Sequence, residues 1–447
     1  MSDRAPAQTL WDLVELDFGP LEPDDPRLVE TAAARGDFSR APLFKRLGVD
    51  PVTHKLHRAP RQCYALLFGH RGCGKSTELR RIARELDSPL AYCVVFLDVL
   101  STLDPHNLQY PDVFLALAET LVSILNEREV DIDKEHLERL EQWFQQRIET
   151  HAETKDFAAE IKAGVKIKAG LPWLGQLFAA CTNAFKVNST YKRELRRVVQ
   201  NSFSEFAAAF NLLIRGAGDA LAKKGYGGHV LFVVDGLDRL NSDDALRLYV
   251  KDVYQLQQIE GIFLYVAPIH MLYSSNAVNH AFYTFKLPMI KLAEKGSDVR
   301  IEPAYAALRQ LVFKRADPAL FVDEAVVDRL IVSSGGHPRD LLRLLNYSYE
   351  YATGDKIDHS AAEKAVRRMT SDYRRLILKD DYALLREIDE SPPKYASNNA
   401  RVQELLHNLV ILEYSDYWWR LHPLVQTLPG YVEAGGSGAR EARDGRA

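Results

Sequence analysis

Short apolar runs and longer amphipathic segments alternate along the first two thirds of the chain. Runs of strand length lie at residues 64–68, 91–98, 229–235 and 261–267, and a fifth lies at 284–290. Between them, apolar residues recur at helical spacing, most clearly at 78–86, 111–128, 134–149 and 243–259. Strands that alternate with helices indicate a parallel sheet covered on both faces. The pattern therefore predicts an α/β core.

The pattern becomes purely helical after this core. Helical spacing covers residues 303–315, 323–333, 338–352 and 360–379, which predicts a helical lid. Two further helices, at 381–390 and 398–409, precede a hairpin at 410–421, and that order is typical of a winged helix. We therefore expect a lead-in at 1–62 with short helices near 28–34 and 43–47, a core at 63–299, a lid at 300–379, a winged helix at 380–432 and a disordered tail at 433–447.

Residues 150–228 form a long insertion between two predicted strands of the core. Within it, residues 160–170 alternate apolar residues with lysine, which favours a β-ribbon. Residues 169–185 carry no charge, but Pro172 and polar residues interrupt them, and they fall short of the ~20 apolar residues that span a bilayer. We expect a surface for a partner or for self-association there, and no membrane contact. A helix over 191–222 should break around 216–218.

The first apolar run leads directly into a glycine-rich motif. Residues 69–76 have the sequence GHRGCGKS, which matches G-x-x-x-x-G-K-[ST] at every fixed position. In such a loop the backbone N–H groups turn toward phosphate oxygens, and the helix that follows adds its positive pole. Lys75 is expected to reach the β- and γ-phosphates, and the Ser76 hydroxyl to bind Mg²⁺. The predicted nucleoside triphosphate site comprises Gly69, Gly72, Cys73, Gly74, Lys75, Ser76 and Thr77.

Two aspartates follow the strand predicted at 229–235. Asp235 ends the strand, so its carboxylate is expected at the carboxyl edge of the sheet, where it would hold Mg²⁺ directly or through water. Asp238 is the candidate for polarising the attacking water, which makes Asp238 and Lys75 the predicted catalytic residues. Each aspartate has the alternative role of capping the helix that follows.

The amino-acid composition limits the classes of function that the protein can have. The 447 residues are 47% hydrophobic and 26% charged, as in ordinary soluble domains. A net charge of −4 gives no global attraction to nucleic acid, so any DNA-binding face must be local. The four cysteines lack the spacing of metal ligands, and no signal peptide precedes the core, so we expect a cytoplasmic protein.

Several motifs together resemble one branch of the P-loop ATPases. The phosphate loop, the strand ending in VVDGLD at 233–238, the lid helix opening with GHPR at 336–339 and the terminal winged helix are similar to AAA+/STAND proteins. Initiator-type and transposition-regulator ATPases, and bacterial signalling ATPases similar to them, are the nearest groups. The likeness covers roughly residues 60–430. It implies ATP as the nucleotide.

The resemblance also implies roles for two lid residues. Pro338 falls where the family's proline rests against adenine, and Arg339 where a lid arginine senses the γ-phosphate; the alternative for Arg339 is a surface arginine. The chain departs from the family pattern at Gly236 and Arg239, where AAA+ and STAND proteins usually place glutamate. We therefore expect an ATPase with slow turnover.

Two functions stay open on this basis. In the first, ATP controls a switch that oligomerises or engages an effector protein, with anti-phage defence as a setting that the resemblance suggests. In the second, the protein is a DNA-binding ATPase that assembles on duplex DNA. Residues 380–432 carry four basic and eight acidic residues, so DNA would contact the basic helical faces at 192–197 and 364–379 instead. We favour the first function.

Overall fold

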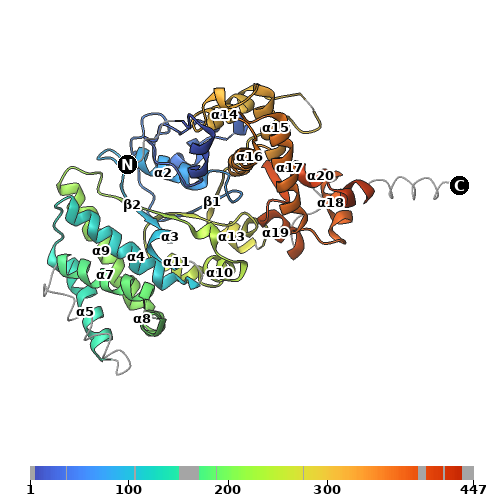
Figure 1. Ribbon diagram of the computed structural model, residues 1–447. Coiled ribbons are helices and arrows are strands. Elements are labelled where there is room, and N and C mark those ends of the chain that lie inside the picture. The colour runs from blue at the N-terminus through green and yellow to red at the C-terminus, as the bar shows by residue number, and fades with distance from the viewer. Residues whose placement is uncertain are drawn as a thin grey trace. The chain divides into compact units, whose positions relative to one another are not determined.

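The computed structural model describes residues 6–36, 38–104, 107–150, 171–187, 189–274, 276–297, 299–390, 399–415 and 418–434 (Figure 1). The chain divides into two compact units. Unit 1 comprises Met1–Ser39, Gly69–Glu78 and Lys286–Ala447, and unit 2 comprises Arg40–Phe68 and Leu79–Phe285. The phosphate loop thus belongs to the same unit as the lid and the C-terminal hairpin.

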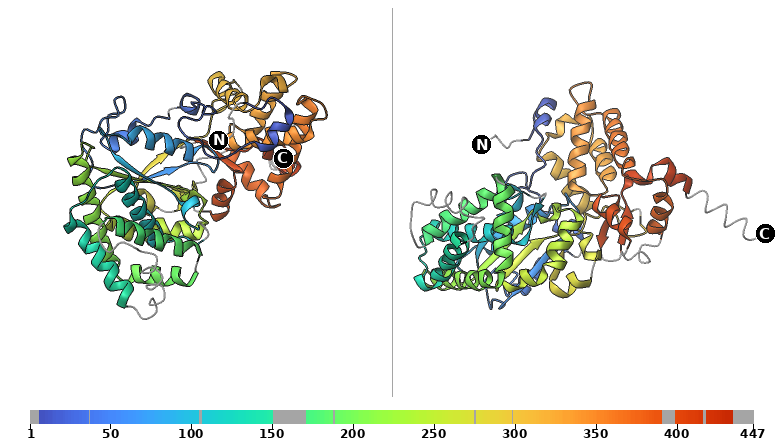
Figure 2. Two further views of the ribbon diagram at one scale, coloured as in Figure 1. Left: turned by 60° about the vertical axis from the view of Figure 1, so that its left-hand side comes forward. Right: turned by 90° about the horizontal axis from the view of Figure 1, so that it is seen from below.

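A five-stranded sheet forms the centre of unit 2. Its strands are β1 (Cys63–Phe68), β2 (Cys93–Asp98), β3 (Val230–Asp235), β4 (Ile262–Val266) and β5 (Tyr283–Lys286), in the order β2-β3-β4-β1-β5. The pairs β2–β3, β3–β4 and β1–β4 are parallel. In the left view of Figure 2 the strands lie between helices. The predicted α/β class is confirmed, although β5 ends at Lys286, before Pro288.

The main core of unit 2 lies between this sheet and a layer of helices that precede or belong to the insertion. Alternate residues of β1 to β4, such as Leu66, Val95 and Phe232, enter it, as the two-residue period of a strand requires. The helices that supply the opposite side are α4 (Tyr110–Glu127), α5 (Lys134–Thr150), α7 (Leu171–Val187), α8 (Ser189–Asn201) and α9 (Phe203–Lys223).

Helix α7 contains most of the segment, residues 169–185, for which a partner surface is predicted. It packs along α4, and its side chains Leu174, Leu177, Phe178 and Cys181 are buried in the core. One face of the uncharged segment therefore belongs to the core, whereas Pro172 and Asn183 are exposed, and the partner surface stays a prediction. Among the described residues, no helix combines the length and apolar character needed to cross a membrane. The ribbon predicted at 160–170 lies outside the described residues.

The helix predicted at 191–222 is confirmed, but its break lies elsewhere. Helix α8 ends at Asn201 and α9 begins at Phe203, whereas Gly216 continues inside α9. A Cβ on Gly216 would lie 2.7 Å from the Cβ of His136, so the glycine allows α5 and α9 to approach closely. Close packing between helices, and not a break, explains this glycine.

Shorter elements complete unit 2. The helix predicted at 243–259 is present but contains a π-turn, so that it consists of α10 (Ser242–Leu246), η6 (Arg247–Lys251) and α11 (Val253–Gln258). The remaining elements are α1 (Ala41–Arg46), α2 (Lys75–Leu86, which starts in unit 1), α3 (Val99–Thr102), η5 (Leu237–Arg239), α12 (Met271–Ser274) and α13 (Asn276–Ala281).

Unit 1 contains the predicted lid and the helix–helix–hairpin segment. The lid helices are α14 (Glu302–Phe313), α15 (Glu324–Ser334), α16 (Pro338–Tyr351) and α17 (His359–Arg374). They are followed by α18 (Asp381–Glu390), α19 (Ala400–His407), the antiparallel pair β6 (Ile411–Ser415) and β7 (Trp418–Leu421), and α20 (Pro423–Gln426). The described lead-in holds η1 (Leu10–Glu15) and η2 (Ala32–Arg35), and η7 (Pro318–Leu320) joins two lid helices. The winged-helix identity and the predicted domain boundaries remain predictions.

Candidate nucleotide-binding site

The phosphate loop occupies the turn between β1, which ends at Phe68, and α2, which begins at Lys75. Gly72 has a φ of +93°, in the left-handed region that side chains disfavour. The Cys73 side chain is buried, so only its backbone is placed to meet a ligand. The loop therefore has the conformation that its glycines predict, and its role in binding phosphate remains a prediction.

The Lys75 side chain is held by hydrogen bonds to its own loop. Its side chain is buried, and Nζ donates hydrogen bonds to the carbonyl oxygens of Gly69 at 2.8 Å and His70 at 2.9 Å. An arriving phosphate would compete with these neutral carbonyls for the ammonium group, and a charged acceptor forms the stronger hydrogen bond. Ser76 and Thr77 follow in the first turn of α2, where the Thr77 hydroxyl accepts the backbone N–H of Leu21 at 3.2 Å.

Arg35 supports the loop from the lead-in, and the sequence analysis missed it. The Arg35 residue is 4% exposed. Its Nη2 donates to the carbonyl oxygen of Cys73 at 2.7 Å, and its Nη1 donates to the carbonyl oxygen of Pro288. Its Nε donates to the Thr31 hydroxyl at 3.1 Å. Burial lowers the pKa of Arg35. One guanidinium thus joins three segments of unit 1 behind the loop. No local pattern marks such an arginine, because two of its three partners, Cys73 and Pro288, are distant in sequence.

The lid contacts the tip of the loop through His337. Its Nδ1 accepts the backbone N–H of Asp340 at 3.3 Å and caps helix α16. With Nδ1 as the acceptor, Nε2 carries the hydrogen and donates it to the carbonyl oxygen of Arg71 at 2.9 Å. A Cβ on Gly72 would lie 2.9 Å from both the Cβ of Arg339 and Cε1 of His337. The structure therefore brings the start of α16, with Pro338 and Arg339, against the loop.

The C-terminal hairpin contacts the same loop. The backbone N–H of Glu413, in β6, donates to Nε2 of His70 at 2.8 Å. The Glu413 side chain, 1% exposed, forms an ion pair of 2.5 Å with Lys286. Burial, together with the nearby His337 and Lys75, holds the pKa of His70 well below its usual value. Glu413 is therefore a buried structural carboxylate, whereas the sequence analysis counted it among the charges of the wing.

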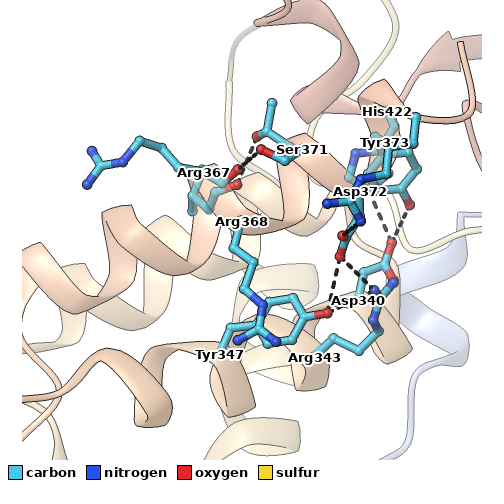
Figure 3. A network of polar contacts seen from close by, with 12 residues as sticks. Asp340, Arg343, Tyr347, Arg367, Arg368, Ser371, Asp372, Tyr373 and His422 are labelled. Carbon is cyan, nitrogen blue, oxygen red and sulfur yellow. Dashed lines mark hydrogen bonds and ion pairs between the residues drawn. The ribbon is translucent and has the colours of Figure 1, made fainter.

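A buried carboxylate links these lid contacts (Figure 3). Asp340 is 1% exposed; its Oδ2 accepts the Tyr373 hydroxyl at 2.5 Å and lies 3.3 Å from Nε2 of His422. Arg343 donates to its Oδ1 at 3.3 Å. Burial alone raises the pKa of this carboxyl, but the facing His337 and His422 outweigh burial and hold the pKa well below its usual value. The ionised carboxylate ties α16 to α17 and to the segment after β7.

Unit 2 presents two aspartates at the carboxyl ends of adjacent strands. Asp235 ends β3, is buried, and accepts the backbone N–H of Gly236 at 2.8 Å. Asp98 ends β2 and is the register partner of Asp235, and the sequence analysis did not select it. Asp238 follows in η5 and is partly exposed. Carboxylates at this edge are suited to a hard cation such as Mg²⁺. In the described part of the chain, no group of three or more His, Cys, Asp or Glu residues could hold a metal by itself.

The departure from the family pattern at Gly236 has a local cause. Its φ is +87°, and a Cβ there would lie 2.9 Å from Cγ of Leu100. A glutamate at this position would need both an unfavourable backbone conformation and displacement of Leu100. The turn after β3 therefore accepts glycine and disfavours the carboxylate that the resemblance suggests.

Two of the four basic residues in the first predicted basic face are buried inside unit 2. Arg196 is buried, and its Nε donates to Oδ1 of Asp112 at 2.8 Å. Lys192 is also buried, with Nζ 3.8 Å from Asp104. These two cations hold α8 against α4 and are not free to bind phosphate. Lys192 and Arg196 therefore do not contribute to a DNA-binding face, whereas Arg193 and Arg197 on α8 and Arg367 on α17 are exposed. DNA binding by these helices remains a prediction.

No family model matches the chain, and no curated protein matches it. Similar solved structures include the RuvB Holliday-junction branch-migration motor of Thermotoga maritima, at 12% identity and a TM-score of 0.35, covering 90% of this chain and 95% of that chain. A variant of the same RuvB has 12% identity and a TM-score of 0.36, covering 91% and 96%. Cdc6p from Pyrobaculum aerophilum has 10% identity and a TM-score of 0.34, covering 92% of this chain and 99% of that chain.

Proposed function

We propose that the protein is an ATP-binding molecular switch that hydrolyses ATP slowly and whose nucleotide state controls self-assembly or the engagement of an effector protein. The proposal includes anti-phage defence as the biological process in which this switch acts. One observation carries it: the phosphate loop is hydrogen-bonded both to the lid, through Arg71 and His337, and to the C-terminal hairpin, through His70 and Glu413. A ligand that rearranges the loop would change both contacts.

Nucleotide binding would use the loop in the usual way of P-loop proteins. Backbone N–H groups of residues 69–76 and the ammonium of Lys75 would bind the β- and γ-phosphates. Ser76 and Asp235 would hold Mg²⁺, which, when bound, neutralises phosphate charge and orients the phosphates for attack. Pro338 would face the adenine and Arg339 the γ-phosphate. The proximity of Arg339 to Gly72 supports this assignment.

Slow hydrolysis follows from the residues around the attacking water. Asp238 is the proposed residue that polarises this water, and Gly236 and Arg239 stand where related ATPases carry glutamate. Without a glutamate at either position, Asp238 is the one group proposed to orient the water and accept its proton. A long-lived ATP state suits a switch better than a motor, because assembly can persist between turnovers.

The proposed site is tested by equilibrium binding of a fluorescent ATP analogue with and without Mg²⁺. Loss of charge-assisted hydrogen bonds costs about 1.5–3 kcal/mol, so Lys75→Ala should weaken binding by roughly tenfold to hundredfold. Lys356→Ala, at an exposed lysine of the same unit, is the matched control and should bind as the wild type does. Unchanged affinity in Lys75→Ala would refute the assignment of the loop.

A DNA-binding ATPase that assembles on duplex DNA is the second candidate. The exposure of Arg367, Arg374 and Arg375 on and just after α17 favours it. DNA binding through several such cations would weaken steeply as salt rises, because neutralised phosphates release counterions. A salt-independent affinity, or none at physiological salt, would rule this candidate out.

A further inference from the structure

A concave, basic site lies on the lid between α16 and α17, apart from the phosphate loop (Figure 3). Its volume is about 570 Å³, which is within the range of small-ligand sites. Helix α16 contributes Tyr347 and Tyr351 to its wall, and the α17 side contributes Lys364, Arg367, Arg368 and Arg375. Neither the fold nor the proposed ATP site requires this concentration of positive charge.

The charges that line this site are not balanced. Four cationic side chains and one carboxylate, Asp372, line the site, and together with Glu350, which pairs with Arg368, they carry a net charge of +2. Arg368 is paired with Glu350, and Nη1 of Arg375 lies 3.4 Å from Oδ1 of Asp372. In the part of the chain that the structure describes, no carboxylate lies within ion-pair distance of Lys364 or Arg367. Cations held close together repel one another, so a bound anion would relieve this repulsion.

The wall of the site is already ordered. The guanidinium carbon of Arg368 lies 4.0 Å from the centre of the Tyr347 ring, a cation–π contact that fixes the arginine over the aromatic face. The Tyr347 hydroxyl donates to Oδ2 of Asp372 at 3.2 Å, and Arg343 donates to the same oxygen at 3.3 Å. Side chains held in place before binding lose less conformational entropy when a ligand arrives.

We propose that this site binds a small anion bearing several phosphate groups, of the nucleotide or oligophosphate class. Planar guanidinium groups bind phosphate oxygens in pairs, and several neighbouring cations match the multiple charges of such an anion. The Ser371 hydroxyl lies in the same lining and adds a neutral hydrogen-bonding group. An extended polyanion fits less well, because Glu350 and Glu363 flank the site on α16 and α17.

The test is calorimetric titration of the full chain with tripolyphosphate. The Lys75→Ala variant weakens the phosphate loop as a competing site, so one tripolyphosphate should bind tightly per chain. Should that variant fail to fold, the wild type serves instead: two tripolyphosphates should bind per chain, one at the phosphate loop and one at the lid site. Arg367→Ala and Lys364→Ala should each weaken this binding by about tenfold or more.

Arg374→Ala is the matched control, because it removes the same charge from the same helix outside the lining of the site. It should change the affinity by less than about twofold. If Arg374→Ala and Arg367→Ala lost equal amounts of tripolyphosphate affinity, the binding would be a diffuse attraction between charges, and the proposal would be overturned. The proposal would also be overturned if tripolyphosphate did not bind, whether or not a short DNA duplex bound through these residues. ATP binding at Lys75 is measured separately, so either proposal can fail alone.

Discussion

His70 of the phosphate loop and Glu413 of the C-terminal hairpin are joined by a hydrogen bond of 2.8 Å, in which the Glu413 backbone N–H donates to Nε2 of His70. The two residues are separated by most of the chain, yet both are buried within unit 1. The contact makes the hairpin sensitive to the conformation of the loop. It also gives His70, at a position that the phosphate-loop motif leaves open, a structural role of its own.

Replacing His70 with leucine should destabilise unit 1. The Glu413 N–H would lose its acceptor inside the protein, and an unsatisfied buried donor costs about 1–3 kcal/mol. Urea unfolding monitored by tryptophan fluorescence measures this loss. His359→Leu, at a histidine whose ion pair with Asp323 is exposed, should cost less than about 0.5 kcal/mol. Equal stability of the two variants would show that the loop–hairpin bond is dispensable.

Acid should weaken the fold through His70. Its pKa in the folded protein is well below 6.5, so below pH 6.5 the unfolded chain binds a proton that the folded chain does not. The free energy of unfolding should therefore fall as the pH drops below 6.5, by at most about 1.4 kcal/mol per pH unit from this one group. His70→Gln, which keeps an acceptor and cannot titrate, should show a shallower pH dependence of stability; an identical slope would contradict the assignment.

Arg35→Ala should reduce ATP affinity although Arg35 is not expected to touch the nucleotide. The substitution leaves the buried carbonyl oxygens of Cys73 and Pro288 without this donor and frees the back of the loop. A loss of about tenfold in affinity is expected from the lost hydrogen bonds to a charged group. Arg35→Lys should restore only part of the affinity, because one ammonium cannot replace the guanidinium fork. Wild-type affinity in Arg35→Ala would remove this supporting role.

Asp238→Asn should separate ATP binding from hydrolysis. An amide cannot accept the proton of the attacking water, so turnover should fall by about a hundredfold or more while ATP remains bound. Phosphate release and equilibrium binding, measured on the same preparation, distinguish the two effects. Asp243→Asn, at an exposed aspartate of the neighbouring helix, is the control. Should Asp238→Asn turn over ATP at the wild-type rate, another group must activate the water.

The sequence predicts the local elements of this protein well, because their patterns lie within short windows. The strands ending in Phe68 and Asp235 are continuous apolar runs, and the phosphate-loop motif lies between a strand and a helix. The fifth strand was predicted over residues 284–290, whereas β5 ends at Lys286, two residues before Pro288. Such small errors arise where tertiary contacts set the end of an element.

The contacts that assemble the candidate site could not be predicted in the same way. Arg35 and Glu413 carry no local signal, because a buried charge and a surface charge look alike in one sequence. Arg196 looks like part of a basic surface until Asp112 is found beside it. The uncharged run in α7 likewise has the composition of either a core helix or an exposed patch, and only its packing on α4 decides between them.

The mass of the protein in solution, measured by light scattering, tests the central claim most directly. Wild type and Lys75→Ala would be compared with ADP and with a non-hydrolysable ATP analogue, each with and without duplex DNA. The account predicts that the ATP analogue alone raises the mass of the wild type and that ADP does not. Lys75→Ala should not respond at analogue concentrations that just saturate the wild type. A rise in mass that requires DNA, or one that persists equally in Lys75→Ala, would contradict the account.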